Sequence, residues 1–295
     1  MTTLQTLAEQ LRAACLLEAT ARKPGNVHPE TSFPDLTYAD FVRSAEAAAP
    51  VLARAEELGV GRTIFEAVAA TRQAAPSNTN LGMILLLAPL AAIPAGTSLC
   101  DGIGTVLRTL TVEDAVWAYR GIRLAQPGGM GEQSEQDLTA EPTVTLREAM
   151  ALAADRDLIA SQYITNFSVV LTTGFPLLCR EASFEERWEE ALISLQLHLM
   201  AEYPDSLIAR KCGVETALEA RLRAQQVLTE GWPGRSGSAK TLHDFDQWLR
   251  ADGHRRNPGT TADLIAASLF AALRDGRLPC PGWVSTLSAD GSPSA

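Results

Sequence analysis

Apolar residues recur at three- and four-residue spacing along most of the chain, which is the pattern of amphipathic helices. One segment shows it clearly, with Trp188, Ala191, Leu192, Leu195 and Leu199 on one helical face. The segments with this spacing are rich in Ala, Leu, Glu and Arg, which favour helices. We therefore expect an all-α protein.

Helix-start signals agree with this expectation. Four Ser or Thr residues stand three positions before an acidic residue, at residues 37–40, 111–114, 145–148 and 183–186. A capping box takes Glu or Gln at the last place, so the final two qualify fully and the two Asp versions are weaker. Only residues 163–178 have strand-like composition, and one such run cannot form a sheet by itself.

The length of 295 residues suits one large domain or two small ones, and no break in composition forces a split. We predict a single large helical domain over residues 1–284. The tail over residues 285–295 is small and polar, and we predict that it is disordered. Two further segments, 126–143 and 230–238, are rich in Gly together with Pro or Gln and are predicted to be irregular.

A long uncharged stretch between Arg72 and Asp101 raises the question of a membrane span. Its strongly apolar part, residues 81–95, has about 15 residues, whereas about 20 are needed to cross a bilayer. Pro89 and Pro94 also interrupt it. We expect a buried core helix here and no membrane partner.

Charge and cysteine content narrow the class further. The chain has 35 acidic and 25 basic residues and a formal net charge of −10, with no sustained basic run, so no nucleic-acid partner is expected. An anionic ligand can still bind in a local basic pocket. The five cysteines form no Cys-x-x-Cys pair, which argues against disulfides and a zinc site. Because no signal peptide is evident either, we expect a cytoplasmic location.

Small polar side chains interrupt the apolar pattern in four places, which we call clusters 1 to 4. They comprise residues 23–28, 76–82, 203–211 and 255–263. An unpaired polar group that is buried costs about 1–3 kcal/mol, so such groups need partners or ligands. Four polar turns so far apart in sequence predict one converging site.

The first two clusters each have two interpretations. Pro24 and Gly25 can simply end the first helical segment, or Lys23 can offer a point charge to a phosphate with Glu18 about one turn upstream. The polar residues 78–80 can cap the apolar helix after them. Capping needs only one of these three residues, so the other two are available to a ligand. A helix N-terminus also favours an anion, which supports the ligand-binding interpretation.

The last two clusters also allow two interpretations. Asp205 and Ser206 precede two cations and can form a solvated turn, or Asp205 can ligate the Mg²⁺ of a metal-phosphate site. In cluster 4, Pro258 and Gly259 predict a turn before a helix that has Asp263 in its first turn. An Asp there often only complements the helix dipole, but it is also a second candidate ligand for Mg²⁺.

Taken together and in order, the four motifs resemble the triphosphoribosyl-dephospho-CoA synthase family. The motifs that carry the resemblance are Lys23-Pro24-Gly25, Asn78-Thr79, Asp205-Ser206 and Pro258-Gly259-Thr260-Thr261-Ala262-Asp263-Leu264. The resemblance spans about residues 10 to 275. Each motif is weak alone, whereas four in this order are fairly specific.

The resemblance implies an all-helical ATP-dependent enzyme that uses Mg²⁺. The ribose 2′-hydroxyl of 3′-dephospho-CoA would attack the anomeric carbon of ATP and expel adenine. Glycosyl transfer of this kind passes through an oxocarbenium-like state, which needs a nearby carboxylate and a base. The catalytic candidates are Asp205, Asp263 and Glu18, of which Asp205 and Asp263 are also the metal candidates. The nucleotide- and phosphate-binding candidates are Lys23, Gly25, Asn78, Thr79, Asn80, Ser206, Arg210, Lys211, Arg256, Asn257, Gly259 and Thr260.

Two departures from the family pattern indicate a divergent branch. The family's Asn-Thr-His-Lys-Gly motif reads Asn-Thr-Asn-Leu-Gly here, with Leu81 in place of the cation. Its Gly-Ala-Arg-Gly-Glu-Ala loop is echoed only by residues 128–132, without the Arg. A charge-assisted hydrogen bond contributes about 1.5–3 kcal/mol, so these losses predict ATP binding with poor activity on dephospho-CoA.

Two alternatives therefore stay open. One is a related ATP-dependent transferase or phosphotransferase that makes another cofactor, because chains with the Asn-Thr-Asn-Leu-Gly form resemble a branch found beside methanopterin-linked one-carbon pathways. The other is a non-catalytic helical binding protein.

Overall fold

The computed structural model describes residues 4, 6–77, 79–125, 141–180 and 183–287. Helices account for the regular structure of this part of the chain, where pairing between extended residues is limited to isolated bridges. The all-α prediction is confirmed. The helices are α1 (Leu7–Thr20), α2 (Tyr38–Leu52), α3 (Ala55–Leu58), α4 (Val60–Ala74), α5 (Leu81–Ala91), α6 (Leu99–Thr109), α7 (Val112–Ala125), α8 (Leu146–Ala151), α9 (Leu158–Ile164), the π-helix η1 (Val169–Gly174), α10 (Phe175–Cys179), α11 (Phe184–Glu202), α12 (Ser206–Cys212), α13 (Val214–Thr229), α14 (Ser236–Arg250), α15 (Gly259–Arg274) and the 3-10 helix η2 (Gly282–Thr286).

The irregular segments and the tail are covered only in part. Residues 230–235 connect α13 to α14 through turns, as predicted for most of segment 230–238. Helix η2 includes the first residues of the predicted tail. Residues 126–140 and 288–295 lie outside the described residues, so the domain limit at residue 284 stays a prediction.

Local capping explains several of the helix starts. Thr37, Thr111 and Thr145 each accept a hydrogen bond from the amide of the acidic residue three positions on, and that acid accepts one in return from the threonine amide. Ser183 was predicted to do the same, and this prediction is wrong: its side chain makes no capping bond. The first turn of α11 is distorted instead, with non-helical angles at Arg187.

The strand-like composition of residues 163–178 does not produce a strand. This stretch runs through the end of α9, then η1 and α10. Helix η1 packs against α15 so closely that a Cβ at Gly174 would lie 2.1 Å from Ser268 Oγ. Val169 and Val170 are buried in this helix, and tertiary packing therefore overrides their strand preference.

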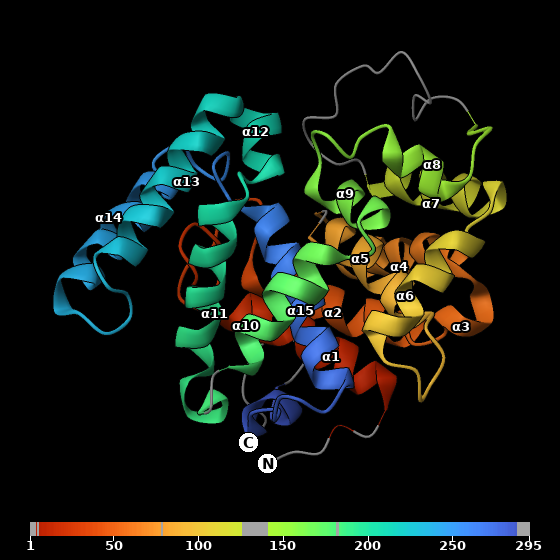
Figure 1. Cartoon of the computed structure of the whole chain (residues 1–295), viewed down its shortest axis with the longest axis horizontal. Coiled ribbons are helices and arrows are strands. Elements are labelled where there is room, and N and C mark those ends of the chain that lie inside the picture. Colours follow the sequence, from red (N-terminus) through yellow and green to blue (C-terminus); the bar gives the residue numbers. More distant parts are fainter. Residues whose placement is uncertain (1–3, 5, 78, 126–140, 181–182, 288–295) are drawn as a thin grey trace.

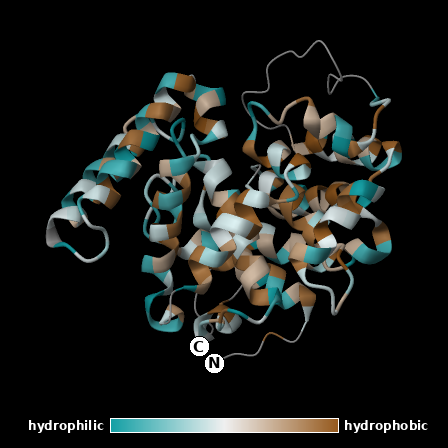
Figure 2. Ribbon diagram, viewed as in Figure 1, coloured by the Kyte–Doolittle hydropathy of each residue, from teal (hydrophilic) through white to brown (hydrophobic). Residues whose placement is uncertain are grey.

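Helix α15 lies at the centre of a large core (Figure 1). Thirteen of its sixteen residues are buried, and it packs against α1, α5, α10, α11 and η1. Figure 2 shows hydrophobic residues gathered where α4, α5 and α15 meet. Every residue of α5 except Gly82 is buried, which confirms the prediction of a buried core helix. Among the residues that the structure describes, no helix has both the length and the apolar content that a bilayer crossing requires.

A smaller second core lies beside the first and is built from α11 to α14. Its buried residues include Leu197 on α11, Ile208 on α12, Ala220 on α13 and Phe245 on α14. In Figure 1, α13 and α14 extend from the left side of the molecule, and α11 stands between them and the large core. We call the boundary between the two cores, where residues 203–211 meet residues 255–263, the seam.

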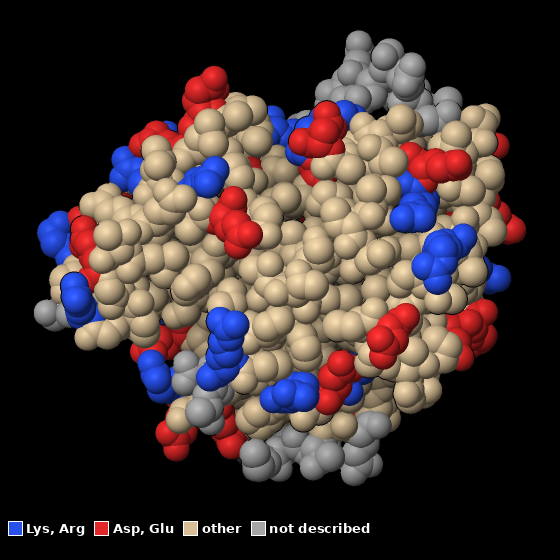
Figure 3. All heavy atoms as spheres, in the orientation of Figure 1, with Lys and Arg blue, Asp and Glu red and all other residues tan. Residues whose placement is uncertain are grey.

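Charged side chains of both signs are spread over the surface of these two cores. Figure 3 shows Lys and Arg interspersed with Asp and Glu on the face drawn, with wide uncharged areas between them. On this face the charges therefore form no large patch of one sign.

Candidate active site

The first two turns of α15 bring the four clusters together. Asp263 was predicted in the first turn of this helix, but α15 begins at Gly259, so Asp263 lies in the second turn. From cluster 3, Asp205 Oδ2 accepts hydrogen bonds from the amide and the hydroxyl of Thr261, each at 2.8 Å. From cluster 2, Gly82 lies so close to Asp263 that a Cβ on Gly82 would be 1.9 Å from Asp263 Oδ2. From cluster 1, Asn26 Nδ2 donates to Asn257 Oδ1 at 2.7 Å. Segments that are far apart in the sequence thus meet at one helix start.

Asp205 is a buried bridge between the two cores. It is the N-cap of α12, and its Oδ1 accepts from the amides of Leu207 and Ile208 at 2.9 and 3.0 Å. With the two bonds from Thr261, its carboxylate accepts four hydrogen bonds and is 1% exposed. Burial raises the pKa of the Asp205 carboxyl, and the hydrogen bonds oppose that rise. A carboxylate with about four acceptor positions has none left for a metal ion.

Asp205→Ala should therefore destabilise the fold. Hydrogen bonds to a charged group contribute about 1.5–3 kcal/mol each, and the buried amide of Thr261 would lose its partner, so we expect the free energy of unfolding to fall by about 3 kcal/mol or more. Asp157→Ala is the matched control, because Asp157 caps α9 with one oxygen and is more exposed. That change should cost about 1 kcal/mol. Equal losses in urea denaturation would contradict the bridging role.

Asp263 differs from Asp205 in being half-buried and facing the seam. Burial raises the pKa of its carboxyl well above the ordinary range. The negative charges of three neighbouring carboxylates raise that pKa further, in the order Glu18, Asp205 and Asp157. Four carboxylates therefore share one region, and Asp263 is the one at its centre.

Lys23 and Glu18 form a buried ion pair behind this region. Lys23 Nζ lies 2.9 Å from Glu18 Oε1, and the two side chains are 0% and 3% exposed. Lys23 also donates to the backbone carbonyl of Glu18. Lys23 was predicted to hold a phosphate, but the structure buries its ammonium away from solvent. Burial raises the pKa of the Glu18 carboxyl, whereas Lys23 lowers it.

The rest of cluster 1 packs against the start of cluster 4 and the end of α14. Gly25 has a φ of +76°, and a Cβ there would lie 2.9 Å from both Leu249 and Pro258. Asn26 is held by Gln196 Nε2, which donates to its Oδ1 at 3.1 Å. Only glycine permits both this backbone conformation and the close packing of the turn against Leu249 and Pro258.

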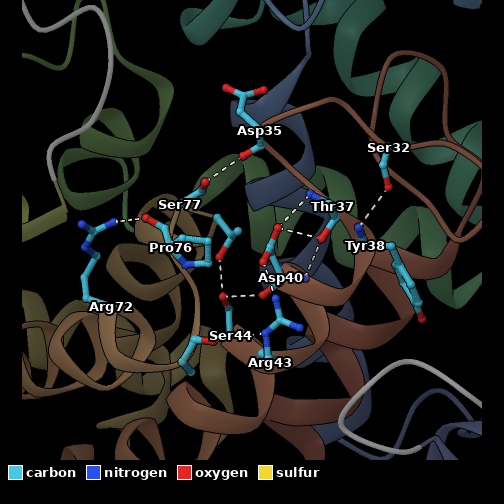
Figure 4. Close-up of polar contacts among 12 residues, drawn as sticks. Ser32, Asp35, Thr37, Tyr38, Asp40, Arg43, Ser44, Arg72, Pro76 and Ser77 are labelled. Carbon is cyan, nitrogen blue, oxygen red and sulfur yellow. Dashed lines mark hydrogen bonds and ion pairs between the residues drawn. The ribbon is translucent and has the colours of Figure 1, made fainter.

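Cluster 2 is anchored to α2 and to the loop before it. Thr79 Oγ1 lies 2.5 Å from Ser44 Oγ, and Asn80 Nδ2 donates to the Ser44 carbonyl at 3.5 Å. Figure 4 shows Ser77 directed toward Asp35, whose carbonyl accepts its hydrogen bond at 2.7 Å. Asn80 is buried and precedes α5 without capping it. Asn78 lies outside the described residues.

The remaining candidates of clusters 3 and 4 interlock. Ser206 Oγ donates to Thr260 Oγ1 at 3.0 Å, and both residues are 5% exposed. Gly259 lies against Leu207, where a Cβ would approach within 2.6 Å. These contacts fix α12 onto α15 and so align the starts of both helices.

The candidate cations take different positions. Arg210 Nη1 lies 3.4 Å from Asp157 Oδ2 at the edge of the seam. Lys211 is half-buried beside it, and burial followed by the charge of Arg210 lowers the pKa of its ammonium. Arg256 instead stacks on the Trp248 ring, with its Cζ 4.6 Å from the ring centre. It was predicted to bind phosphate, and in this structure its guanidinium covers Trp248.

Sequence reasoning missed Asp157, although a signal for it was present. Asp157, Asp205 and Asp263 are each followed by the tripeptide Leu-Ile-Ala, directly or after one residue. Asp157 and Asp205 both cap short helices in the same way, with one carboxylate oxygen accepting from two backbone amides. The repeated tripeptide is enough to group the three carboxylates by sequence alone.

A metal ion would have few protein ligands here. Within the described ranges, the structure has no group of three or more His, Cys, Asp or Glu side chains arranged to hold a metal. Mg²⁺ often binds through one or two carboxylates together with substrate phosphates and water. Of the two metal candidates, Asp263 fits that kind of site better, because the carboxylate of Asp205 already accepts four hydrogen bonds. Asp205 does not fit it.

Comparison with known proteins agrees with the motifs. The chain matches the family model of the ATP:dephospho-CoA triphosphoribosyl transferases over residues 4–280. It is 30% identical over 106 residues to the 2-(5''-triphosphoribosyl)-3'-dephosphocoenzyme-A synthase of Escherichia fergusonii, covering 36% of this chain and 34% of the relative. A relative from Albidiferax ferrireducens named for the same activity is 34% identical over 99 residues, covering 34% of this chain and 32% of the relative.

The chain thus spans about a third of the length of the curated relatives it matches. A crystal structure from Archaeoglobus fulgidus, named for a triphosphoribosyl-dephospho-CoA synthase, superposes with a TM-score of 0.63 at 26% identity. The superposition covers 79% of this chain and 98% of that one. Because the family model extends over nearly the whole sequence, the chain belongs to the ATP:dephospho-CoA triphosphoribosyl transferase family.

Proposed function

We propose that this protein transfers the triphosphoribosyl group of ATP to the 2′-hydroxyl of 3′-dephospho-CoA and releases adenine. The observation that carries the proposal is the position of Asp263. Its half-buried carboxylate projects from the second turn of α15 onto the first turn of α5, among three other carboxylates.

The negative potential at Asp263 suits the transition state of this reaction. As the bond between the anomeric carbon and adenine N9 breaks, its electron pair leaves with adenine and the sugar becomes positively charged. The 2′-hydroxyl oxygen forms the new bond to that carbon, and its proton passes to the Asp263 carboxylate. Adenine takes up a proton from water as it leaves, and Asp263 then returns its proton to water. A raised pKa makes this carboxylate a stronger base than an ordinary Asp.

The triphosphate needs positive charge nearby. The free amides at a helix start favour anions; α15 starts at the seam, and α5 starts beside Asp263, against which Gly82 packs. Arg210 and Lys211 on α12 lie at its edge and can approach a phosphate. Mg²⁺, when bound, would neutralise phosphate charge, with one oxygen of Asp263 as its protein ligand. A carboxylate has two oxygens, so the other remains free to accept the proton.

The test is to incubate the purified protein with ATP, Mg²⁺ and 3′-dephospho-CoA, and to measure adenine release and product mass. We expect free adenine and a product heavier than dephospho-CoA by one triphosphoribosyl group. Formation of ADP in place of adenine would indicate a phosphotransferase. Nucleotide-dependent thermal stabilisation without any product would indicate a binding protein.

One observation supports a different acceptor as a second candidate. Leu81, which replaces a family cation, is buried at the start of α5. The burial of Leu81 does not test which acceptor is used, so poor activity on dephospho-CoA stays a prediction. It can be checked by comparing adenine release with dephospho-CoA and with other hydroxyl-bearing cofactor precursors. Rates on dephospho-CoA typical of an enzyme's own substrate would overturn it.

A further inference from the structure

Gly82 leaves a space that the Asp263 carboxylate fills. Gly82 is the second residue of α5, and a Cβ there would lie 1.9 Å from Asp263 Oδ2 and 2.5 Å from its Cγ. The tip of Ile159 on α9 would be 2.6 Å away. The contact with the carboxylate is much shorter than any real Cβ contact, so the two groups cannot both occupy these positions.

The backbone of Gly82 does not itself require glycine. Its φ is not positive, unlike that of Gly25 or Gly59. Glycine is an unfavourable residue within a helix, because it loses more conformational freedom than alanine. Gly237 provides the comparison: it is also the second residue of its helix, α14, and a Cβ there would meet nothing within 4 Å. Space for Asp263, not backbone geometry, therefore distinguishes Gly82.

We propose that Gly82 is a positioning residue for Asp263. The missing side chain lets the carboxylate lie against the first turn of α5, 1.9 Å from where a Cβ of Gly82 would be. This contact fixes the carboxylate of a residue on α15 relative to a second helix. The inference rests on the proposed function, because it assumes that the position of Asp263 matters for the transfer reaction.

The kinetic expectation is specific. In Gly82→Ala the carboxylate must move by about 1 Å or more, and misplacement on that scale costs about 100-fold in rate. We expect kcat for adenine release to fall about 100-fold while KM for ATP changes less than about threefold, since most of the contacts to ATP would remain. Gly237→Ala should leave both constants unchanged.

Thermal unfolding provides a readout that needs no turnover. We expect Gly82→Ala to lower the Tm in the wild-type background and to leave it unchanged or raise it in an Asp263→Ala background, where the carboxylate is absent. Gly237→Ala should leave it unchanged or raise it in both backgrounds. If the wild type releases no adenine, the proposed function fails. The Tm values of the single and double variants still decide whether Gly82 and Asp263 are coupled.

Two results would overturn the inference. One is a Gly82→Ala protein with wild-type kcat. The other is an equal loss of Tm with and without the Asp263 carboxylate, which would show that the new methyl group acts on Ile159 or on α5 itself.

Discussion

Replacing Asp263 by asparagine is expected to reduce kcat for adenine release about 1,000-fold while the protein stays folded. An asparagine has nearly the same shape but can neither accept the hydroxyl proton nor carry the charge that stabilises the sugar cation, and loss of a general base costs about 10²–10⁴ in rate. Removing one of several mutually repelling carboxylates also relieves strain in the fold. The measurement is steady-state adenine release together with the Tm.

Asp275→Asn is the matched control for this change. Asp275 follows the opposite end of the same helix, and burial raises the pKa of its carboxyl too. Asp275 lies far from the seam along α15, so the Asp275→Asn enzyme should have wild-type kcat. For the wild type, activity should fall as the pH falls through the raised pKa of Asp263, because only the deprotonated carboxylate accepts a proton. An Asp263→Asn enzyme with wild-type kcat would remove Asp263 from the mechanism.

Lys23→Met is expected to lower the free energy of unfolding by about 3–5 kcal/mol. The change leaves the Glu18 carboxylate buried without its partner, and an uncompensated buried charge is costly. The double variant Glu18→Gln with Lys23→Met removes both charges and should recover much of the loss. Urea denaturation of the three proteins measures these differences.

The pair between Arg62 and Glu66 on α4 provides the control for that experiment. It is a single-helix pair with side chains that are 55% and 29% exposed. Arg62→Met should change the free energy of unfolding by about 0–1 kcal/mol. A loss at Lys23 no larger than the loss at Arg62 would mean that the Lys23 pair contributes little and that its burial has another cause.

Local rules predicted the helices well where a helix carries its own start signal, as α2, α7 and α8 do. The threonine caps and the apolar spacing act within one or two turns, so the sequence contains all the information they need. The kinked start of α11 and the π-helix after α9 could not be predicted, because packing against other elements decides them.

The sequence could name candidate residues for the site, but not how each one is placed. Lys23, Asp205 and Arg256 are all polar residues in turns, as expected. In the structure, Lys23 forms a buried ion pair, Asp205 accepts from Thr261 on another helix, and Arg256 stacks on Trp248. The sequence around each residue does not reveal which of these contacts it makes. The space at Gly82 has the same origin, because the group that fills it lies on a helix about 180 residues later.

The seam divides the proposed reaction between two parts of the molecule. Asp263, Gly82 and the starts of α5 and α15 belong to the large core, whereas Arg210 and Lys211 lie on α12 of the small core. Under the proposed function, substitutions of Arg210 and Lys211 on α12 would change how the anionic substrate is held, while the carboxylate of Asp263 stays in place on the large core.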